Sequence, residues 1–445
     1  MRLQADVKGN GNERPEGDHV CIVIHPDLSK NEKTDRSPEA GLQEGVGLAM
    51  AIDLNVAYSE IIRVNKPKSP TLLGSGAVER VGQIVAGQTD YCIGCDLVII
   101  NAALSPIQQR NLERTWQCKV VDRTGLILEI FGARAQTKEG RLQVDLAALS
   151  FQRSRLVRSW THLERQRGGS GFMGGPGETQ IESDRRLIDQ QITQLKHRLK
   201  DVKRTRELHR KARMRVPYPI VALVGYTNAG KSSLFNRLTN AHVVVKDQLF
   251  ATLDPTMRKL NLPSGKSIIM SDTVGFVSNL PHELVNAFHA TLEEVMSADL
   301  IVHVRDTSHA DTDAQKNDVL FVLEALGIDT SSENETFIEV LNKSDLLSPD
   351  QLEFFKNRQN KVTRNEFMTS AITGAGCDEL SYILDQLITS TYEELDINLS
   401  HQDGATLAWL YEHGDVITRK DNEADIALTV RLGEVDAERL RRRLN

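Results

Sequence analysis

The eight residues GYTNAGKS, at positions 225–232, constrain the fold more than any other part of this chain. They match the phosphate-binding pattern GxxxxGK[ST], in which glycines let the backbone curl so that successive N–H groups point at a phosphate. The apolar run IVALV precedes them as a buried strand would, and residues 233–238 open a helix whose N-terminus favours anions. The sequence therefore predicts a strand–loop–helix unit within a doubly wound α/β domain.

Two side chains of this loop are suited to a nucleotide and its metal ion. Lys231 places a positive charge against the β- and γ-phosphates, and the Ser232 hydroxyl can ligate Mg²⁺. Asp272, in the DTVG that follows the strand-like run SIIM, is expected to hold Mg²⁺ through water. The Gly275 N–H can meet the γ-phosphate and sense its presence. We therefore expect a nucleoside triphosphate and Mg²⁺ to bind here.

The tetrapeptide NKSD at 342–345 follows the strand-like run FIEVL and selects the base. The Asp345 carboxylate can accept two hydrogen bonds from the edge of guanine, and adenine offers no such pair of donors. Lys343 would lie along the base plane. The tripeptide SAI at 370–372 matches the backbone element that closes over the guanine oxygen. GTP is therefore the expected nucleotide.

The segment FATLDPT at 250–256 is expected to supply a second Mg²⁺-binding hydroxyl. Thr252 is the better candidate and Thr256 the alternative, because spacing does not separate them. Directly after Gly275 stands Phe276, where a Ras-type GTPase carries its water-orienting glutamine. Asp247 and the nearby acidic residues offer no obvious substitute. We expect slow intrinsic hydrolysis, with a partner completing the site or the docked protein reordering its own switch residues.

The expected site residues fall into three overlapping sets. The expected catalytic residues are Lys231, Thr252 and Gly275, and the expected Mg²⁺ ligands are Ser232 and Thr252. The expected GTP-binding residues are Gly225, Tyr226, Thr227, Asn228, Ala229, Gly230, Lys231, Ser232, Phe250, Ala251, Thr252, Leu253, Asp254, Asp272, Thr273, Val274, Gly275, Asn342, Lys343, Ser344, Asp345, Ser370, Ala371 and Ile372.

The remaining chain divides into further regions. Residues 1–19 are polar and are expected to form a disordered tail. Residues 20–150 alternate strand-like and helix-like segments, which predicts a small parallel α/β domain. The prolines of RVPYPI mark the start of a nucleotide-binding domain at 217–395, and residues 396–445 are expected to form a small C-terminal α+β domain.

Residues 151–216 concentrate positive charge in an acidic protein. They hold 17 Lys and Arg against 7 Asp and Glu, whereas the whole chain has a net charge of −7. Apolar residues at helical spacing, in 156–163 and again in 188–202, predict a long antiparallel helical hairpin with a glycine-rich tip at 167–179. This one-signed surplus favours contact with RNA phosphates. The expected contacts are Arg165, Arg167, Phe172, Met173, Arg185, Arg186, Arg198, Lys203, Arg204 and Arg206, with Phe172 stacking on a base.

Composition excludes several classes of protein. With 40% hydrophobic and 26% charged residues, the chain is of ordinary globular type. No apolar run approaches the roughly 18 residues of a membrane span. Five cysteines suit a reducing cytosol, and the CxxC at 92–95 lacks the second pair that a zinc site requires. We expect a cytoplasmic monomer that does not bind DNA.

The motifs together resemble those of the HflX family of translational GTPases, in the Obg–HflX group. GYTNAGKS, DQLFATLDPT, DTVGF and LPHELVNAF carry the resemblance, and RTGLILEIFGARA, EGRLQVDLA and GGPGETQIESDRR extend it to about residues 20–390. It implies binding to the large ribosomal subunit and its rRNA, GTP hydrolysis stimulated there, and splitting or rescue of stalled ribosomes under stress. It also implies that the hairpin tip reaches toward the peptidyl-transferase region. The implied location is cytoplasmic, partly at the ribosome or a membrane surface.

Two other functions remain open at this stage. The basic hairpin alone would suit an RNA helicase or chaperone that acts on ribosomal RNA and is driven by ATP or GTP. The family has been linked to ATP binding through its N-terminal part, and the sequence leaves that question open. Phe276 leaves room for a GTP-dependent adaptor that has no catalytic task. NKSD argues against ATP as the main fuel.

Overall fold

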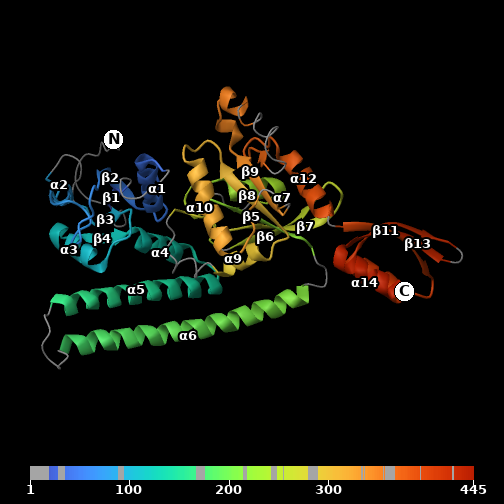
Figure 1. The fold of residues 1–445 in the computed structure, drawn as a ribbon, viewed down its shortest axis with the longest axis horizontal. Helices are drawn as coiled ribbons and strands as arrows, with labels where there is room; N and C mark the ends of the chain where they lie inside the picture. The colour runs from blue at the N-terminus through green and yellow to red at the C-terminus, as the bar shows by residue number, and fades with distance from the viewer. Residues whose placement is uncertain are drawn as a thin grey trace.

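The computed structural model describes most of the chain (Figure 1). The described residues are 20–28, 36–88, 95–166, 176–213, 218–241, 248–253, 255–278, 289–331, 334, 336–353, 355, 366–390, 392–422 and 425–444. They form a parallel N-terminal sheet, a pair of long helices, a six-stranded central sheet and a C-terminal antiparallel sheet. Within these ranges, no helix combines the length and the apolar character needed to cross a bilayer.

The N-terminal sheet is parallel and has the strand order β2-β1-β3-β4. Its elements are β1 (Val20–Asp27), α1 (Pro38–Met50), β2 (Asn55–Arg63), α2 (Ser75–Val85), β3 (Leu97–Ile100), α3 (Pro106–Trp116), β4 (Lys119–Asp122) and α4 (Arg123–Arg134). Helices α2 and α3 contribute to the hydrophobic cluster on one face, and α1 and α4 contribute to the cluster on the other. Because both faces are covered, the strands are nearly continuous apolar runs.

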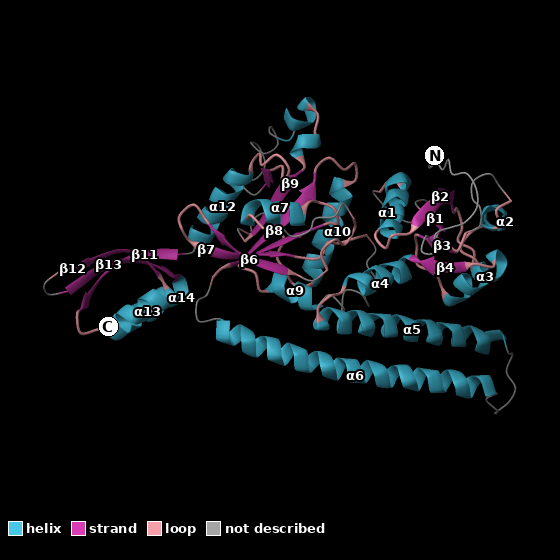
Figure 2. Cartoon of the chain, turned by 180° about the vertical axis from the view of Figure 1, so that it is seen from behind, coloured by secondary structure: helices cyan, strands magenta, loops and turns pink. Residues whose placement is uncertain are grey.

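Two long helices lie side by side beneath the sheets, as Figure 2 shows from behind. They are α5 (Lys138–Gln166) and α6 (Pro176–Arg213). The predicted hairpin boundary at 150/151 falls inside α5, because Leu142 and Ala147 are buried and no proline interrupts the helix. On α6, Ile192 is buried within the predicted apolar seam, and the flanking arginines are exposed.

The central sheet has the order β10-β9-β8-β5-β7-β6, with β6 antiparallel to β7 and the other pairs parallel. Its elements are β5 (Ile220–Gly225), α7 (Lys231–Thr239), β6 (Thr256–Asn261), β7 (Ser267–Asp272), α9 (His289–Met296), β8 (Leu300–Asp306), α10 (Thr312–Ala325), β9 (Phe337–Asn342), the 3₁₀ turn η1 (Ser344–Leu346), β10 (Glu366–Met368) and α12 (Cys377–Ser390). Helices α7 and α12 cover one face. The other face shares a single hydrophobic cluster with α1 and α4 of the N-terminal region.

The C-terminal sheet is antiparallel, with the order β11-β13-β12. Its elements are β11 (Tyr392–Ser400), α13 (Gly404–His413), β12 (Asp415–Asp421), β13 (Asp425–Gly433) and α14 (Glu434–Leu444). Alternate residues of β13 are buried in a separate hydrophobic cluster, as expected for a sheet covered on one face. The predicted fold class is confirmed: an N-terminal parallel α/β unit, a helical hairpin, a P-loop domain and a small α+β unit.

Candidate nucleotide-binding site

The phosphate loop joins β5 to α7 and depends on two glycines. Gly225 has φ +150°, and a Cβ there would lie 2.2 Å from the Val304 carbonyl oxygen. Gly230 has φ +90°, and a Cβ there would lie 2.2 Å from Asn342 Nδ2. No L side chain fits either position. The two glycines of the pattern are therefore required because the loop passes close to residues of the neighbouring strands β8 and β9.

Lys231 opens α7 and is buried beneath the loop. Its Nζ donates to the carbonyl oxygens of Gly225 at 3.1 Å and Tyr226 at 2.8 Å. Burial lowers the pKa of this ammonium to about 8, although the nearby Asp272 carboxylate favours the charged form. A phosphate group at the loop would favour the charged form further.

Three oxygen-bearing side chains meet beside the loop. Asp272 Oδ2 accepts hydrogen bonds from Ser232 Oγ at 2.6 Å and Thr252 Oγ1 at 3.0 Å, and the two hydroxyls lie 2.9 Å apart. Asp272 Oδ1 is buried and has no hydrogen-bond partner among the described residues. This set of hard oxygen donors, one of them unpaired, fits Mg²⁺. Burial raises the pKa of Asp272 despite these bonds, and a cation at this position would lower it by stabilising the carboxylate.

The same geometry separates the two threonines that spacing left open. Thr252 contributes its hydroxyl to the oxygen cluster. Thr256 begins β6 and is the backbone partner of Asp272 in the antiparallel ladder. Thr252 is therefore the residue that the fold brings to the metal-binding oxygens.

Asn342 connects the base-reading segment to the phosphate loop. Its Nδ2 donates to the Ala229 carbonyl oxygen at 2.9 Å, and its Oδ1 accepts from the Ala371 N–H at 3.1 Å. Asp345 Oδ1 accepts from Ser370 Oγ at 2.5 Å. Residues of NKSD and SAI, more than two dozen positions apart, are thus brought together as the guanine motifs predict.

Lys343 is held by a residue that the motifs did not identify. Its Nζ pairs with Asp306 Oδ2 at 2.7 Å, and its backbone has a φ of +62°. Asp306 ends β8, next to β9 in the sheet. Because the carboxyl ends of neighbouring parallel strands meet at one edge of a sheet, this rule could have identified Asp306 from the sequence.

Several other expected GTP-binding residues are buried or hydrogen-bonded within the protein, where they support the site-forming loops. Leu253 and Val274 are buried, and the Thr273 hydroxyl donates to the Leu223 carbonyl oxygen at 2.6 Å. The Ser344 N–H donates to the Thr369 carbonyl oxygen at 3.1 Å. Ile372 is 75% exposed, so its side chain lies outside the packed core.

Phe276, at the usual glutamine position, is 6% exposed and belongs to the hydrophobic cluster shared with the N-terminal region. Its N–H donates to the Gly225 carbonyl oxygen at 3.1 Å, and its own carbonyl oxygen accepts from the Thr227 N–H at 2.7 Å. A Cβ on Gly275 would lie 2.8 Å from Thr227 Cα. The switch backbone is therefore fastened to the phosphate loop, and the Phe276 side chain serves the core.

A cavity of about 50 Å³ lies at the phosphate end of the site. It is lined by the phosphate loop, by 248–252 and by Thr273 and Gly275. Thr227 Oγ1 is buried here with no hydrogen-bond partner among the described residues. Gln248 also lines the cavity, and the sequence motifs did not single it out.

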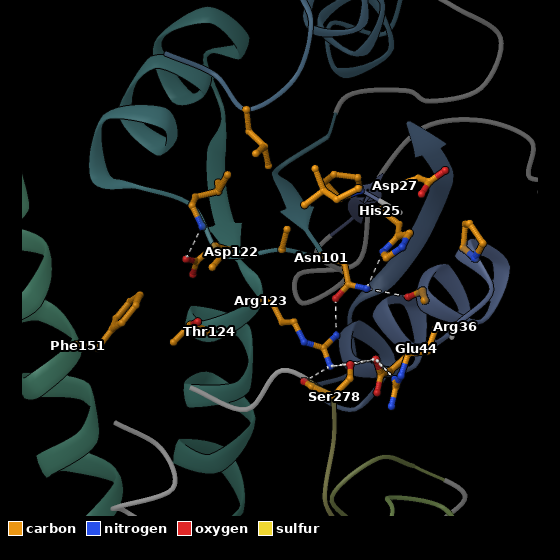
Figure 3. Close-up of a pocket in the computed structure, with 18 of the residues that line it drawn as sticks. His25, Asp27, Arg36, Glu44, Asn101, Asp122, Arg123, Thr124, Phe151 and Ser278 are labelled. Carbon is orange, nitrogen blue, oxygen red and sulfur yellow. Dashed lines mark hydrogen bonds and ion pairs between the residues drawn. The ribbon is translucent and has the colours of Figure 1, made fainter. Parts of the chain in front are cut away.

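A second buried network links the phosphate loop and the switch to the N-terminal sheet (Figure 3). Arg123 Nη2, at the start of α4, donates to Glu44 Oε2 at 2.9 Å and to Ser278 Oγ at 2.8 Å. The Ser278 N–H donates to the Tyr226 hydroxyl at 2.7 Å, and that hydroxyl donates to Glu44 Oε1. Burial would raise the pKa of Glu44, but Arg123, Tyr226 and Arg36 outweigh it and hold that pKa below its usual value. We call these residues the interdomain joint.

The interdomain joint forms one wall of a polar cavity of about 530 Å³ (Figure 3). The cavity lies at the carboxyl ends of the N-terminal strands, beside the point where the strand order reverses between β1 and β3. Asn101 Nδ2 lies 3.1 Å from His25 Nδ1, and Asn101 Oδ1 accepts from Arg123 Nη1 at 2.6 Å. No motif in the sequence indicated this cavity.

The structure describes only some of the expected RNA contacts. Arg185, Arg186, Arg198 and Arg204 are exposed on α6, and Arg186 Nη2 pairs with Glu182 Oε1 at 2.8 Å. The other expected RNA contacts lie outside the described residues or side chains; they are Arg165, Arg167, Phe172, Met173, Lys203 and Arg206. The expected GTP-binding residue Asp254 also lies outside the described residues.

The fold and the site define a P-loop GTPase. Family models match most of the chain: a GTP-binding GTPase N-terminal region at 39–132, a middle region at 134–213, a 50S ribosome-binding GTPase at 220–343 and an HflX C-terminal domain at 356–445. The chain belongs to the HflX family of GTPases, which bind and hydrolyse GTP.

Two relatives are similar over nearly the whole chain. The GTPase HflX of Magnetococcus marinus is 46% identical over 392 residues, which cover 88% of each protein. The GTPase HflX of Escherichia coli is 42% identical over 377 residues, covering 84% of this chain and 85% of that protein. A GTP-binding protein of Sulfolobus solfataricus, solved with GDP, has a TM-score of 0.42 at 20% identity, covering 84% of this chain and 99% of that one.

Proposed function

We propose that this GTPase docks on the large ribosomal subunit through rRNA, hydrolyses GTP there, and splits or rescues stalled ribosomes. The observation that carries the proposal is the row of exposed arginines on α6 in a chain with a net charge of −7. A long helix whose exposed residues include this surplus of arginines suits the phosphates of folded RNA. The match of 220–343 to a 50S ribosome-binding GTPase model supports the same partner. We also propose that the protein acts as a cytoplasmic monomer.

In the proposed reaction the chain mainly binds and orients. Lys231 and the loop N–H groups hold the β- and γ-phosphates, and the Gly275 N–H contacts the γ-phosphate. Ser232 and Thr252 would hold Mg²⁺, with Asp272 behind them. The metal, when bound, supplies neutralisation of the phosphate charge. Asp345 and Asn342 fix the guanine end, so that the γ-phosphate is presented at the cavity lined by Gly275.

Slow intrinsic hydrolysis is part of the proposal. The side chain at the usual glutamine position, Phe276, is buried in the core and carries no polar atom. Docking is therefore proposed to supply or order the group that orients water. The Ser370 hydroxyl holds the Asp345 carboxylate, whose acceptors suit the two donors of guanine and not adenine; this argues against an ATP-driven RNA helicase as the alternative.

Cosedimentation with purified large subunits tests the ribosome proposal. We expect binding with a non-hydrolysable GTP analogue to exceed binding with GDP. Reversal of two α6 charges, Arg198→Glu with Arg204→Glu, should weaken binding and lower the slope of log affinity against log salt by about 2, if each arginine neutralises one phosphate.

The matched control reverses two exposed arginines of α3, Arg110→Glu with Arg114→Glu, and should bind like the wild type. Equal weakening by both pairs would show that net charge, and not the α6 surface, governs binding. Absence of cosedimentation with either nucleotide would rule out the proposed partner. A GTPase rate that added subunits leave unchanged would rule out stimulation.

A further inference from the structure

Gln248 occupies a position suited to hydrolysis that the motifs leave unexplained. It lies four residues before Thr252 and lines the same phosphate-end cavity as Thr252, Gly275 and Lys231. A primary amide has two N–H donors and a carbonyl with two lone pairs, so it can contact a water molecule and a phosphate oxygen together. This is the chemistry that Phe276 lacks.

Arg134, the last residue of α4, holds Gln248 from the N-terminal region. Its Nη2 donates to Gln248 Oε1 at 2.7 Å and to the Ala51 carbonyl oxygen at 2.8 Å, and its Nη1 donates to the Phe250 carbonyl oxygen at 2.8 Å. A planar guanidinium can make these bonds in fixed relative directions, which a lysine cannot reproduce. One side chain therefore fixes residues 248–250 against the end of α1.

Aromatic packing fixes the same segment independently. Phe131 lies one turn before Arg134 on α4, and its ring meets the Phe250 ring edge-on, with centroids 4.7 Å apart and planes at 84°. Phe250 is buried and has a φ of +57°, which is unfavourable for a bulky residue. Such a conformation persists only where surrounding contacts impose it, so the placement of Gln248 is decided by α4.

We propose that Gln248 is the catalytic residue that orients the attacking water, and that Arg134 is its positioning residue. Water oxygen bonds to the γ-phosphorus, the bond from that phosphorus to the β–γ bridging oxygen breaks, and GDP leaves. The water proton passes to a phosphate oxygen, because an amide is not a base at neutral pH. This inference concerns the basal hydrolysis of the free protein. Of the two effects proposed for docking it takes the second, the ordering of a group that the chain already carries, and its test does not depend on the ribosome proposal.

Thr227 provides the competing assignment. Its hydroxyl is buried in the same cavity with no hydrogen-bond partner among the described residues, and it stands within the phosphate loop. A hydroxyl there has one donor and is close to where phosphate oxygens would lie. Gln248 is favoured because it reaches the cavity from the switch segment and is held by a dedicated side chain from another region.

Single-turnover hydrolysis by the full-length protein, without ribosomes, tests the assignment. We expect Gln248→Ala to lower the hydrolysis rate constant by about 100-fold, the effect of removing one preorganised polar group from a transition state, while the Kd for GTP changes less than threefold. Gln315→Ala, a half-buried glutamine of α10 outside the site, should hydrolyse GTP at the wild-type rate.

Arg134 is tested by a double-mutant cycle. Arg134→Ala should lower the rate constant by about 10-fold in the wild-type background and have little effect in Gln248→Ala, because it acts through Gln248. Arg134→Lys should restore little of the loss, since an ammonium cannot reproduce the fork. Additive losses would assign Arg134 a structural role and overturn its positioning role.

Three outcomes would overturn the role of Gln248. The first is wild-type hydrolysis by Gln248→Ala. The second is a loss of GTP affinity as large as the loss of rate, which would assign the residue to binding. The third is a greater loss in Thr227→Val than in Gln248→Ala, which would assign the water contact to the Thr227 hydroxyl. Because ribosomes are absent, failure of the ribosome proposal leaves all three readouts unaffected.

Discussion

The phosphate loop takes part in two polar networks that differ in how the chain assembles them. In the nucleotide site, Ser232, Thr252 and Asp272 come from short motifs within 41 residues of one another. In the interdomain joint, the Tyr226 side chain donates to Glu44, 182 positions earlier in the chain, and Glu44 in turn pairs with Arg123, 103 positions before Tyr226. One loop thus turns its Ser232 side chain toward the expected ligand and its Tyr226 side chain toward the N-terminal region.

The two networks also differ in how completely the protein satisfies their carboxylates, although Arg123 Nε in the joint is likewise buried without a hydrogen-bond partner among the described residues. In the nucleotide site, Asp272 Oδ1 and Thr227 Oγ1 are buried with no hydrogen-bond partner among the described residues. In the joint, both oxygens of Glu44 accept hydrogen bonds from described side chains. The first arrangement is poised for a ligand, and the second is a structural connection. Substitutions should therefore affect binding in the first network and folding in the second.

The largest expected effect is in the nucleotide site, from Asp345→Asn. Loss of two hydrogen bonds to a charged group should cost about 4 kcal/mol, or about 1000-fold in GTP affinity, and should favour xanthosine nucleotides. Competition binding with GTP and XTP measures the change. The exposed Asp378→Asn is the control. An equal loss for both nucleotides would mean that Asp345 does not read the base.

A smaller effect is expected in the interdomain joint, from Glu44→Ala. This change removes the carboxylate that pairs with the buried Arg123 guanidinium and that accepts from the Tyr226 hydroxyl, which should cost about 3 kcal/mol of folding free energy. The double change Glu44→Met with Arg123→Met should cost less than the sum of the single changes. Urea unfolding midpoints measure all three. Strict additivity would show that the two residues do not act as a unit.

The smallest expected effect is on how steeply thermal stability falls at acid pH. The folded protein holds the pKa of Glu44 below its ordinary value of 4.5, so this carboxylate contributes stability above pH 4.5 and loses it as pH falls from there through the folded pKa. Glu44→Gln should therefore show a flatter loss of thermal stability below pH 4.5. The exposed Glu129→Gln should keep the wild-type profile, and a Glu44→Gln profile equal to it would contradict the prediction.

The sequence predicted most of the nucleotide site because each part is local. The backbone conformation of a loop, a strand end or a tetrapeptide depends mainly on residues adjacent in the sequence, as Gly225 and Gly230 illustrate. Thr252 and Thr256 could not be separated, because register in β6 is set by its pairing with β7. The predicted hairpin boundary at 150/151 falls inside α5, because that helix packs against α4 and α3, which lie outside the basic segment.

The sequence by itself determined the phosphate loop, the choice of guanine and the order of strands and helices, since these follow from short-range patterns of glycine, charge and apolar residues. Only the tertiary structure decided which side chains meet across regions. Arg134 with Gln248, and Glu44 with Arg123 and Tyr226, are pairings of common residue types that no spacing rule distinguishes. They are fixed because one hydrophobic cluster packs α1 and α4 against the central sheet and so brings these side chains together.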